Sequence, residues 1–138
     1  MLVWEAGETE SETADCAIGA AHELHKKYWH YRNEALSGVP TGFGIAICGG
    51  HLTRFSSTTF FESCVVNVNL GPTVNQVARL QTLAEPGEVL VNRRVAKTSV
   101  FDWYSFEQVS DSLENKLSQL KGISAFEKEV FKVRHKYF

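Results

Sequence analysis

The alternation of apolar and polar positions predicts a long helix near the start of the chain. Residues 10–38 read "ESETADCAIGAAHELHKKYWHYRNEALSG". Five residues recur there at helical spacing and predict the buried stripe: Ala17, Ala20, Ala21, Leu24 and Tyr28. Thr13 or a neighbouring Ser or Thr can cap this helix, and Gly38, with Pro40 just beyond, predicts its end. The alanines would allow close packing against a sheet.

Short apolar or alternating runs predict the strands. They cover residues 1–6, 41–50, 64–70, 89–92, 101–109 and 129–134. A second helix begins at Pro72, and one or two helical turns follow at 93–100. Residues 51–63 are predicted as a polar connection, and residues 110–119 as a polar loop or hairpin arm. This order predicts one α+β domain over residues 1–138. Because domains usually have a few loose residues before the first strand, we expect Met1 to mark a cut inside a longer unit.

The composition is that of a folded domain and argues against several classes of function. Apolar residues make up 43% of the chain and aromatic residues 12%, which is ordinary for a globular fold. The net charge of -2, without a basic run, argues against a nucleic-acid-binding protein. No apolar run is long enough to span a membrane, and no signal peptide is recognisable. These features favour a cytoplasmic protein.

Three groups of residues that might suggest chemistry are interpreted structurally. Cys16, Cys48 and Cys64 show no CxxC spacing and are interpreted as reduced thiols packed as small apolar groups. The histidines at 22, 25 and 30 match no ligand pattern and are interpreted as solvated helix residues. The glycines of "TGFGIAICGG" match neither phosphate-loop spacing, so we expect them to serve tight backbone packing or a bulge.

The helix that begins at Pro72 has two predicted faces. At about 100° per residue, Val77, Leu80 and Ala84 fall on one arc, whereas Asn75 and Arg79 share the opposite arc. One interpretation is an ordinary solvated face with a local hydrogen bond. The other is a nucleotide site, because an Arg fork binds phosphate oxygens, an Asn can both donate to and accept from a sugar, and the helix dipole favours anions. Spacing alone leaves both open.

The segment "GPTVNQVARLQTLAEPGEVLVN" resembles the signature of the class III adenylate and guanylate cyclases. In that family a T-V-N-x-A-x-R-L helix is followed by an A-x-P-G-x-[IV]-x-[IV] turn and strand. Three further segments resemble family segments in the same order: "MLVWEA" with the alanine-rich helix, "GFGIAICGG" and "QLKGISAFEKEVFKV". The resemblance covers nearly the whole chain.

The resemblance implies a fold and a reaction. The fold would be a ferredoxin-like α+β sheet with helices on one face, truncated at its N-terminus. The reaction would convert ATP or GTP to a 3′,5′-cyclic nucleotide and pyrophosphate for intracellular signalling, with cyclic AMP favoured over cyclic GMP. Asn75 would orient the ribose, and Arg79 would stabilise the phosphoryl group in the transition state. Val68 stands at the family's base-reading position, where an apolar side chain cannot accept a hydrogen bond, so base choice stays open.

The resemblance also implies what this chain lacks. The family binds Mg²⁺ or Mn²⁺ through two aspartates, in segments that are not present here, and the acidic residues 8–12 and Asp15 do not replace them. Family members work as head-to-tail dimers, with a second copy or another cyclase domain, so the isolated chain is predicted to be inactive. Ile123 replaces a triphosphate-contacting lysine, and Lys121 is interpreted as structural.

The sequence leaves two alternative functions open. One is a degenerate cyclase-like domain that only dimerises or senses nucleotide. The other is an unrelated ferredoxin-like binding domain.

Overall fold

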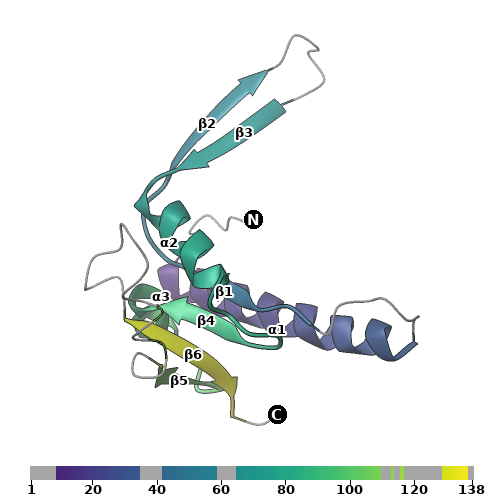
Figure 1. Cartoon of the computed structure of the whole chain (residues 1–138). Coiled ribbons are helices and arrows are strands. Elements are labelled where there is room, and N and C mark those ends of the chain that lie inside the picture. The colour runs from purple at the N-terminus through teal and green to yellow at the C-terminus, as the bar shows by residue number, and fades with distance from the viewer. Residues whose placement is uncertain are drawn as a thin grey trace.

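The computed structural model describes residues 9–34, 42–58, 65–109, 113, 116 and 129–136. Within them the chain mixes helices and strands, so the predicted α+β class is confirmed (Figure 1). The elements are α1 (Glu10–Glu34), β1 (Ile45–Ile47), β2 (Thr53–Thr58), β3 (Val65–Leu70), α2 (Pro72–Gln81), β4 (Val89–Asn92), α3 (Arg93–Thr98), β5 (Tyr104–Gln108) and β6 (Val130–His135). The predicted strand at 1–6, the helix stop at Gly38 and Pro40, and Cys64, Lys121 and Ile123 lie outside the described residues.

Four strands form a mixed sheet in the order β1-β4-β6-β5. β1 and β4 run parallel, and the other two pairings are antiparallel. β1 is therefore an edge strand among the described elements. Its Ile45 N–H donates to the Glu88 carbonyl at 2.9 Å, so Ile45 and Ile47 direct their peptide groups towards β4. Alternation then turns the peptide groups of Ala46 and Cys48 to the outer edge.

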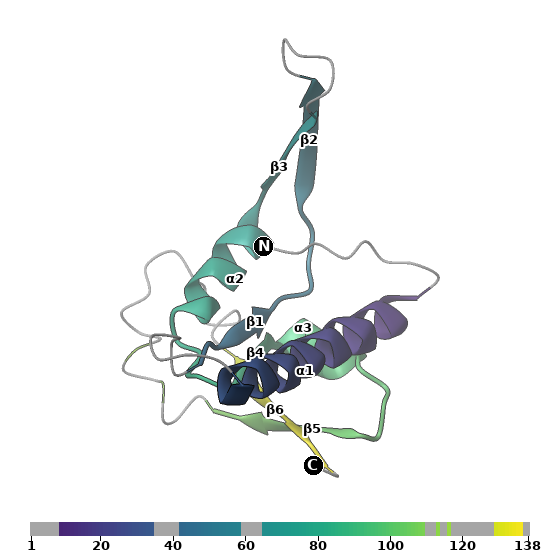
Figure 2. The ribbon, with the colours of Figure 1, turned by 90° about the vertical axis from the view of Figure 1, so that its right-hand side faces the viewer.

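Helices cover both faces of this sheet, so the expectation that they share one face is wrong. α1 and α3 pack on the face that carries Val89 and Val91, whereas Leu80 of α2 packs on Leu90 from the other face. Successive residues of β4 point to opposite faces, and all four are buried. The three successive apolar residues Val89, Leu90 and Val91 need cover on both sides, which α1 and α2 supply (Figure 2).

The buried stripe of α1 differs from the predicted one. Ala17 and Ala21 are buried as predicted, but Leu24 is 46% exposed, and Ile18, which was not in the stripe, is fully buried. Ile18 faces the core of the sheet, whereas Leu24 borders a cavity beside β1. The spacing identified the helix correctly but placed its packing face slightly off.

The histidines of α1 are not uniformly solvated. His30 is exposed as predicted. His25 is only 8% exposed, and its Nε2 lies 3.0 Å from the Phe43 carbonyl, so its interpretation as a solvated residue is wrong. His22 is half-buried and stacks on Tyr104, and its Nε2 is buried without a hydrogen-bond partner among the described residues. His22 is buried by packing against Tyr104 of the sheet, and His25 by packing against Phe43, just before β1.

We expect the protein to lose stability as the pH falls below about 6.5, the ordinary histidine pKa. Burial, with His135 and His25 nearby, lowers the pKa of His22, and burial also lowers the pKa of His25. Because the folded state then binds fewer protons than the unfolded state, the stability present at neutral pH decreases with acidification. Urea unfolding from pH 7.5 to 5 measures this slope. His22→Phe should flatten it and His30→Gln should not; an unchanged slope in His22→Phe would contradict the prediction.

β2 and β3 form a separate two-stranded antiparallel arm that projects from the sheet (Figures 1 and 2). The prediction of β3 is confirmed, but the prediction that residues 51–63 form only a polar connection is wrong, because Thr53–Thr58 is a strand. Register places Phe55 opposite Val68 and Thr53 opposite Leu70 on one face of the arm. Arg54 and Ser56 hydrogen-bond to Asn69 and Asn67 on the other face. The arm therefore has one apolar and one polar face.

The predicted burial of the cysteines is correct for Cys48 and wrong for Cys16. Cys48 is half-buried, and burial raises its pKa to about 12, which fits a packed thiol. Cys16 is exposed, so its interpretation as a packed residue is wrong. Both are free thiols.

Two glycines that flank β1 let α2 and the turn after it pack closely, as the tight-packing interpretation predicted. A Cβ on Gly44 would lie 2.3 Å from the Ala84 carbonyl oxygen, and one on Gly50 would lie 2.2 Å from Thr73 Oγ1. We expect Gly44→Ala to reduce the free energy of unfolding by about 1–3 kcal/mol, because backbone must move. Gly49→Ala is the control, since its Cβ would lie no closer than 3.4 Å to any atom, Arg94 Cγ and Val95 Cγ2 being the nearest. Equal urea midpoints for the two variants would contradict this account.

Candidate functional site

The candidate site is on α2, whose start is fixed by local sequence. Gly71 has φ 139°, a region that favours glycine, and Pro72 occupies the first turn, where its missing N–H has no helical partner. The Gly71 carbonyl accepts from the N–H groups of Val74 and Asn75 at 3.1 and 3.3 Å. The Thr73 hydroxyl donates to the His51 carbonyl at 2.8 Å. The helix N-terminus is thus tied to the chain that enters the arm.

The packing face of α2 is centred on Gln76 and Leu80, the two buried residues of the helix. Leu80 and Ala84 pack in the core as predicted. Val77 was predicted on the same arc, but it is half-buried and borders the cavity beside β1 instead. Gln76 takes the expected place of an apolar residue because Asn92 lies opposite it.

Asn75 and Arg79 lie one turn apart on the side of α2 that does not border the cavity. Asn75 is exposed and Arg79 is half-buried, so neither is sealed beneath neighbouring side chains. The remaining arginines all have partners, which are an aromatic ring, an amide or a carboxylate: Arg32, Arg54, Arg93, Arg94 and Arg134. For the Arg79 guanidinium, the described part of the chain shows no such partner. A half-buried guanidinium that has no partner among the described residues can donate two hydrogen bonds to an anionic group, and the exposed amide one turn away can add a third contact.

Val68 lies on the arm, one strand before α2. It is 44% exposed and pairs with Phe55. Its side chain offers only apolar contact, so it can pack against a base or a partner surface but cannot select a base by hydrogen bonding. The structure places Val68 with the apolar face of the arm, and the grouping of Val68 with Asn75 stays a prediction.

A buried polar network that the sequence did not reveal holds α2 in place. The Asn92 side chain, in a residue only 6% exposed, accepts from the Gly49 N–H at 3.1 Å and the Val95 N–H at 3.2 Å. It donates to the Gly49 carbonyl at 2.9 Å and to Gln76 Oε1 at 3.1 Å. Asn92 thereby joins the end of β1, the start of α3 and α2. Only its position at the end of a buried strand could have suggested this role.

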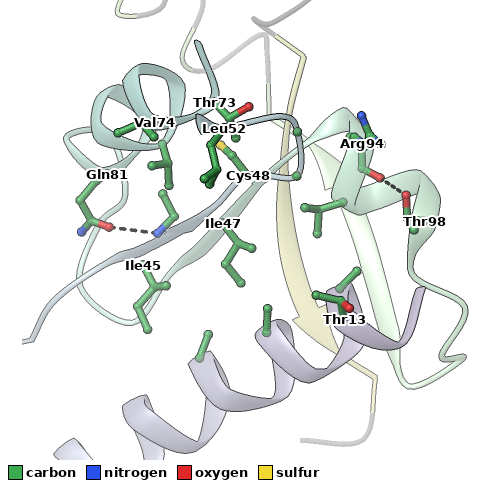
Figure 3. Close-up of a pocket in the computed structure, with 18 of the residues that line it drawn as sticks. Thr13, Ile45, Ile47, Cys48, Leu52, Thr73, Val74, Gln81, Arg94 and Thr98 are labelled. Atoms are coloured by element: carbon green, nitrogen blue, oxygen red, sulfur yellow. Dashed lines mark hydrogen bonds between the residues drawn. The ribbon is translucent and has the colours of Figure 1, made fainter. Parts of the chain in front are cut away.

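Gln81 makes a second polar link between α2 and β1. Its Oε1 accepts from the Ala46 N–H at 3.0 Å (Figure 3). Its Nε2 donates to the Gly44 carbonyl at 2.5 Å. The Gln81 amide hydrogen-bonds to the outward-facing N–H of Ala46 and carbonyl of Gly44, as the backbone of a neighbouring strand would. The two amide links, from Gln76 and Gln81, fix the rotation of α2 about its axis and hence the direction of Asn75 and Arg79.

The residues that the structure describes do not fit a metal centre. Within the described ranges, no group of three or more His, Cys, Asp or Glu side chains is arranged to hold a metal ion. Asp15 is 3% exposed and accepts hydrogen bonds from the Ser99 hydroxyl at 2.5 Å and the Val100 N–H at 3.3 Å. Its carboxylate anchors the chain after α3 to α1, and no residue described here is assigned to a metal.

Comparisons of this chain with protein-family models, with curated proteins and with solved structures find no match. None of the helices in the described residues is both long and apolar enough to cross a membrane.

Proposed function

We propose that this chain is the C-terminal portion of a class III adenylate or guanylate cyclase catalytic domain with a ferredoxin-like fold. It would make a cyclic nucleotide from ATP or GTP with release of pyrophosphate, and would supply the Asn75 and Arg79 half of the site. The observation that carries the proposal is the Arg79 guanidinium, which has no partner among the described residues and lies one turn from the exposed Asn75 amide, on a helix whose other sides are anchored. The cyclase-like motif spans the same helix, turn and strand.

In the proposed reaction the ribose 3′-oxygen attacks the α-phosphate and pyrophosphate leaves. Negative charge builds on the phosphoryl oxygens, and Arg79 would donate to them while Asn75 holds the ribose. Such groups accelerate a reaction only if they are already in place, because reorganisation would offset the gain. The packing of Leu80 and the amide links of Gln76 and Gln81 provide that rigidity.

Divalent metal ligands are expected outside this chain, in a cyclase segment or domain that supplies carboxylates. Mg²⁺ or Mn²⁺ would serve as the cofactor in the complete site. The described residues do not fit such a group, and their proposed roles are confined to binding the ribose and the phosphoryl oxygens.

A second copy of the chain, or another cyclase domain, is the proposed partner. The arm supports this part of the proposal, because two isolated strands are marginally stable in water and its apolar face is open. Phe55, Val68 and Leu70 on that face are 56%, 44% and 53% exposed. Contact with a partner would bury them and stabilise the arm.

A degenerate cyclase-homology domain that only dimerises or senses nucleotide is the second candidate. Val68 favours it, since an exposed apolar side chain stands where the resemblance implies a base-reading polar group. This candidate predicts nucleotide binding or association without turnover.

The two candidates are separated by complementation. We expect the isolated chain to make no cyclic nucleotide from ATP or GTP with Mn²⁺. Mixed with a cyclase domain that keeps its metal carboxylates but lacks its own Asn and Arg, the chain should restore product, which chromatography can measure. Turnover by the isolated chain would refute the assigned location of the metal ligands. Association without product in every pairing would instead support the degenerate domain.

A further inference from the structure

The strand β5 is an edge strand among the described elements, on the side of the sheet away from β1 (Figures 1 and 2). At one end of β5 the Lys136 N–H donates to the Trp103 carbonyl at 2.9 Å. At the other end the Val109 N–H donates to the Val130 carbonyl at 3.1 Å. Because hydrogen-bonded and non-hydrogen-bonded pairs alternate along an antiparallel ladder, the odd-numbered residues of β5 bond to β6. Three residues turn their peptide groups to the outer edge: Tyr104, Phe106 and Gln108.

The peptide groups on this outer edge are available to another strand. The Tyr104 N–H is already bonded, because it donates to the Phe101 carbonyl at 3.3 Å. For the Tyr104 carbonyl, the N–H and carbonyl of Phe106 and the Gln108 N–H, the described part of the chain shows no partner. Unpaired strand edges of this kind bind extended segments through main-chain hydrogen bonds.

Proteins usually protect an open edge with a proline, a bulge or an unpaired charge, and β5 has none of these. Its sequence, YSFEQ, contains no proline, and its register with β6 is continuous. Its charged residue, Glu107, is paired with Arg134 at 2.9 Å. On β1, by contrast, the Gln81 side chain already binds the outer Ala46 N–H. The outer edge of β5 is therefore the better surface for pairing between chains.

We infer that β5 pairs with β5 of a second copy of this chain, antiparallel and across a two-fold axis beside Phe106. Phe106 is the central residue of β5, and its peptide groups face outward, so the two copies of it can exchange N–H···O=C bonds. In the same register each Gln108 N–H meets the Tyr104 carbonyl of the second copy. The register does not depend on the Tyr104 N–H, which is bonded within its own chain. A two-fold contact closes on itself, so the product is a dimer and not a filament.

This register also sets compatible side chains opposite one another. Ser105 lies opposite Glu107 of the second copy, so like charges are not directly opposed. The Glu107 carboxylate remains paired with Arg134 of its own chain. The two Phe106 side chains meet at the axis, on the face of the sheet where Phe106 packs beside the core. A register centred on Tyr104 or on Gln108 would leave part of β5 unpaired.

An exposed aromatic stack at the start of β5 supplies apolar area for the contact. The rings of Phe101 and Trp103 stack with centroids 5.6 Å apart, and the two residues are 50% and 57% exposed. Asp15 accepts from the Val100 N–H at 3.3 Å and so holds the loop that carries the stack. The register places Trp103 opposite Val109 of the second copy, where both would lose contact with water. The contact is smaller than a standard interface, so we expect weak association.

The β5 contact is separate from the arm and from α2, which lie at the other side of the sheet (Figure 1). It does not rest on the proposed cyclase function. A dimer through β5 would leave Asn75 and Arg79 free to meet another cyclase domain.

Sedimentation equilibrium of the full chain tests this inference. A Phe55→Asp background places a charge on the apolar face of the arm and removes association through it, and we expect a monomer–dimer equilibrium to remain. Ser105→Glu sets a carboxylate opposite Glu107 at two symmetric places, so it should raise the dissociation constant about tenfold. Ser105→Lys sets an ammonium there and should lower the dissociation constant severalfold. Gln108→Pro removes an outward N–H that the fold does not use and should also weaken the dimer.

Amide hydrogen exchange locates the contact within the same samples. The N–H groups of Phe106 and Gln108 should exchange more slowly as the dimer fraction rises. The Tyr104 N–H is the internal control, because its bond to the Phe101 carbonyl is present in the monomer. Circular dichroism confirms that each variant is folded before its association is compared.

Three outcomes would overturn the inference. A folded chain that stays monomeric at about 1 mM would show that β5 does not pair with itself and is open to an extended peptide of another protein. Equal dissociation constants for Ser105→Glu and Ser105→Lys would exclude the proposed register. A dimer in which Phe106 and Gln108 exchange as fast as in the monomer would assign association to another surface. These measurements use no nucleotide, so the proposed function stands or fails separately.

Discussion

Replacing Arg79 with alanine should lower turnover in the complemented cyclase assembly by about 10²- to 10³-fold, the usual effect of removing one donor to a developing charge. Because the described residues hold no partner for this guanidinium, its loss should leave the thermal unfolding temperature nearly unchanged. The KM for the nucleotide should change less than kcat, since the contact strengthens in the transition state. Initial rates of cyclic nucleotide formation at saturating Mn²⁺ give both constants.

Two variants sharpen this test. Arg79→Lys keeps the charge but loses the planar fork, so it should recover only part of the lost turnover. Arg134→Ala is the matched control, because Arg134 is an exposed residue paired with Glu107 at 2.9 Å on the far edge strand. Its turnover should equal that of the unmodified chain. Full activity in Arg79→Ala would remove the central support for the proposed site, whatever the fold of the chain.

Residue patterns predicted the elements of this chain well where local chemistry dominates. Gly71 and Pro72 defined the start of α2, and the apolar run at 89–92 defined β4. Among the described strands only β2 was missed; it is rich in Ser and Thr, and it lies in an arm that has no core to impose an apolar pattern. Its pairing with β3 depends on long-range register, which a single segment does not encode.

Side-chain environments were harder to predict than elements. His25 is buried because its ring reaches the Phe43 carbonyl, 18 positions away in the chain. The packing face of α2 is rotated from the predicted arc because Gln76 meets Asn92, a contact between residues 16 positions apart. The Asn75 and Arg79 pair could be found from spacing because both lie on one helix. The links that orient them come from other elements and needed the structure.

Asn92→Ala should reduce the free energy of unfolding by about 3 kcal/mol, an effect large enough to threaten a small domain. The change removes the helix cap that accepts from Val95 N–H, which alone is worth about 1 kcal/mol. It also removes the side-chain partner of the buried Gly49 N–H and carbonyl, and one hydrogen bond of the Gln76 amide. Urea unfolding monitored by circular dichroism measures the loss. Asn69→Ala, on the exposed face of the arm, should change stability by less than about 0.5 kcal/mol.

Asn92→Asp separates the two halves of the network. One carboxylate oxygen can still accept from the Val95 and Gly49 N–H groups. The other oxygen replaces the amide NH₂ that donated to the Gly49 carbonyl and Gln76 Oε1, so two acceptors face each other there. The cap would therefore survive while the link to α2 is lost. We expect Asn92→Asp to lower turnover in the complemented assembly as well as stability, because Gln76 follows Asn75 and helps set its direction. If Asn92→Asp matched the unmodified chain in both measurements, the orientation of Asn75 and Arg79 would have to depend on Leu80 and Gln81 alone.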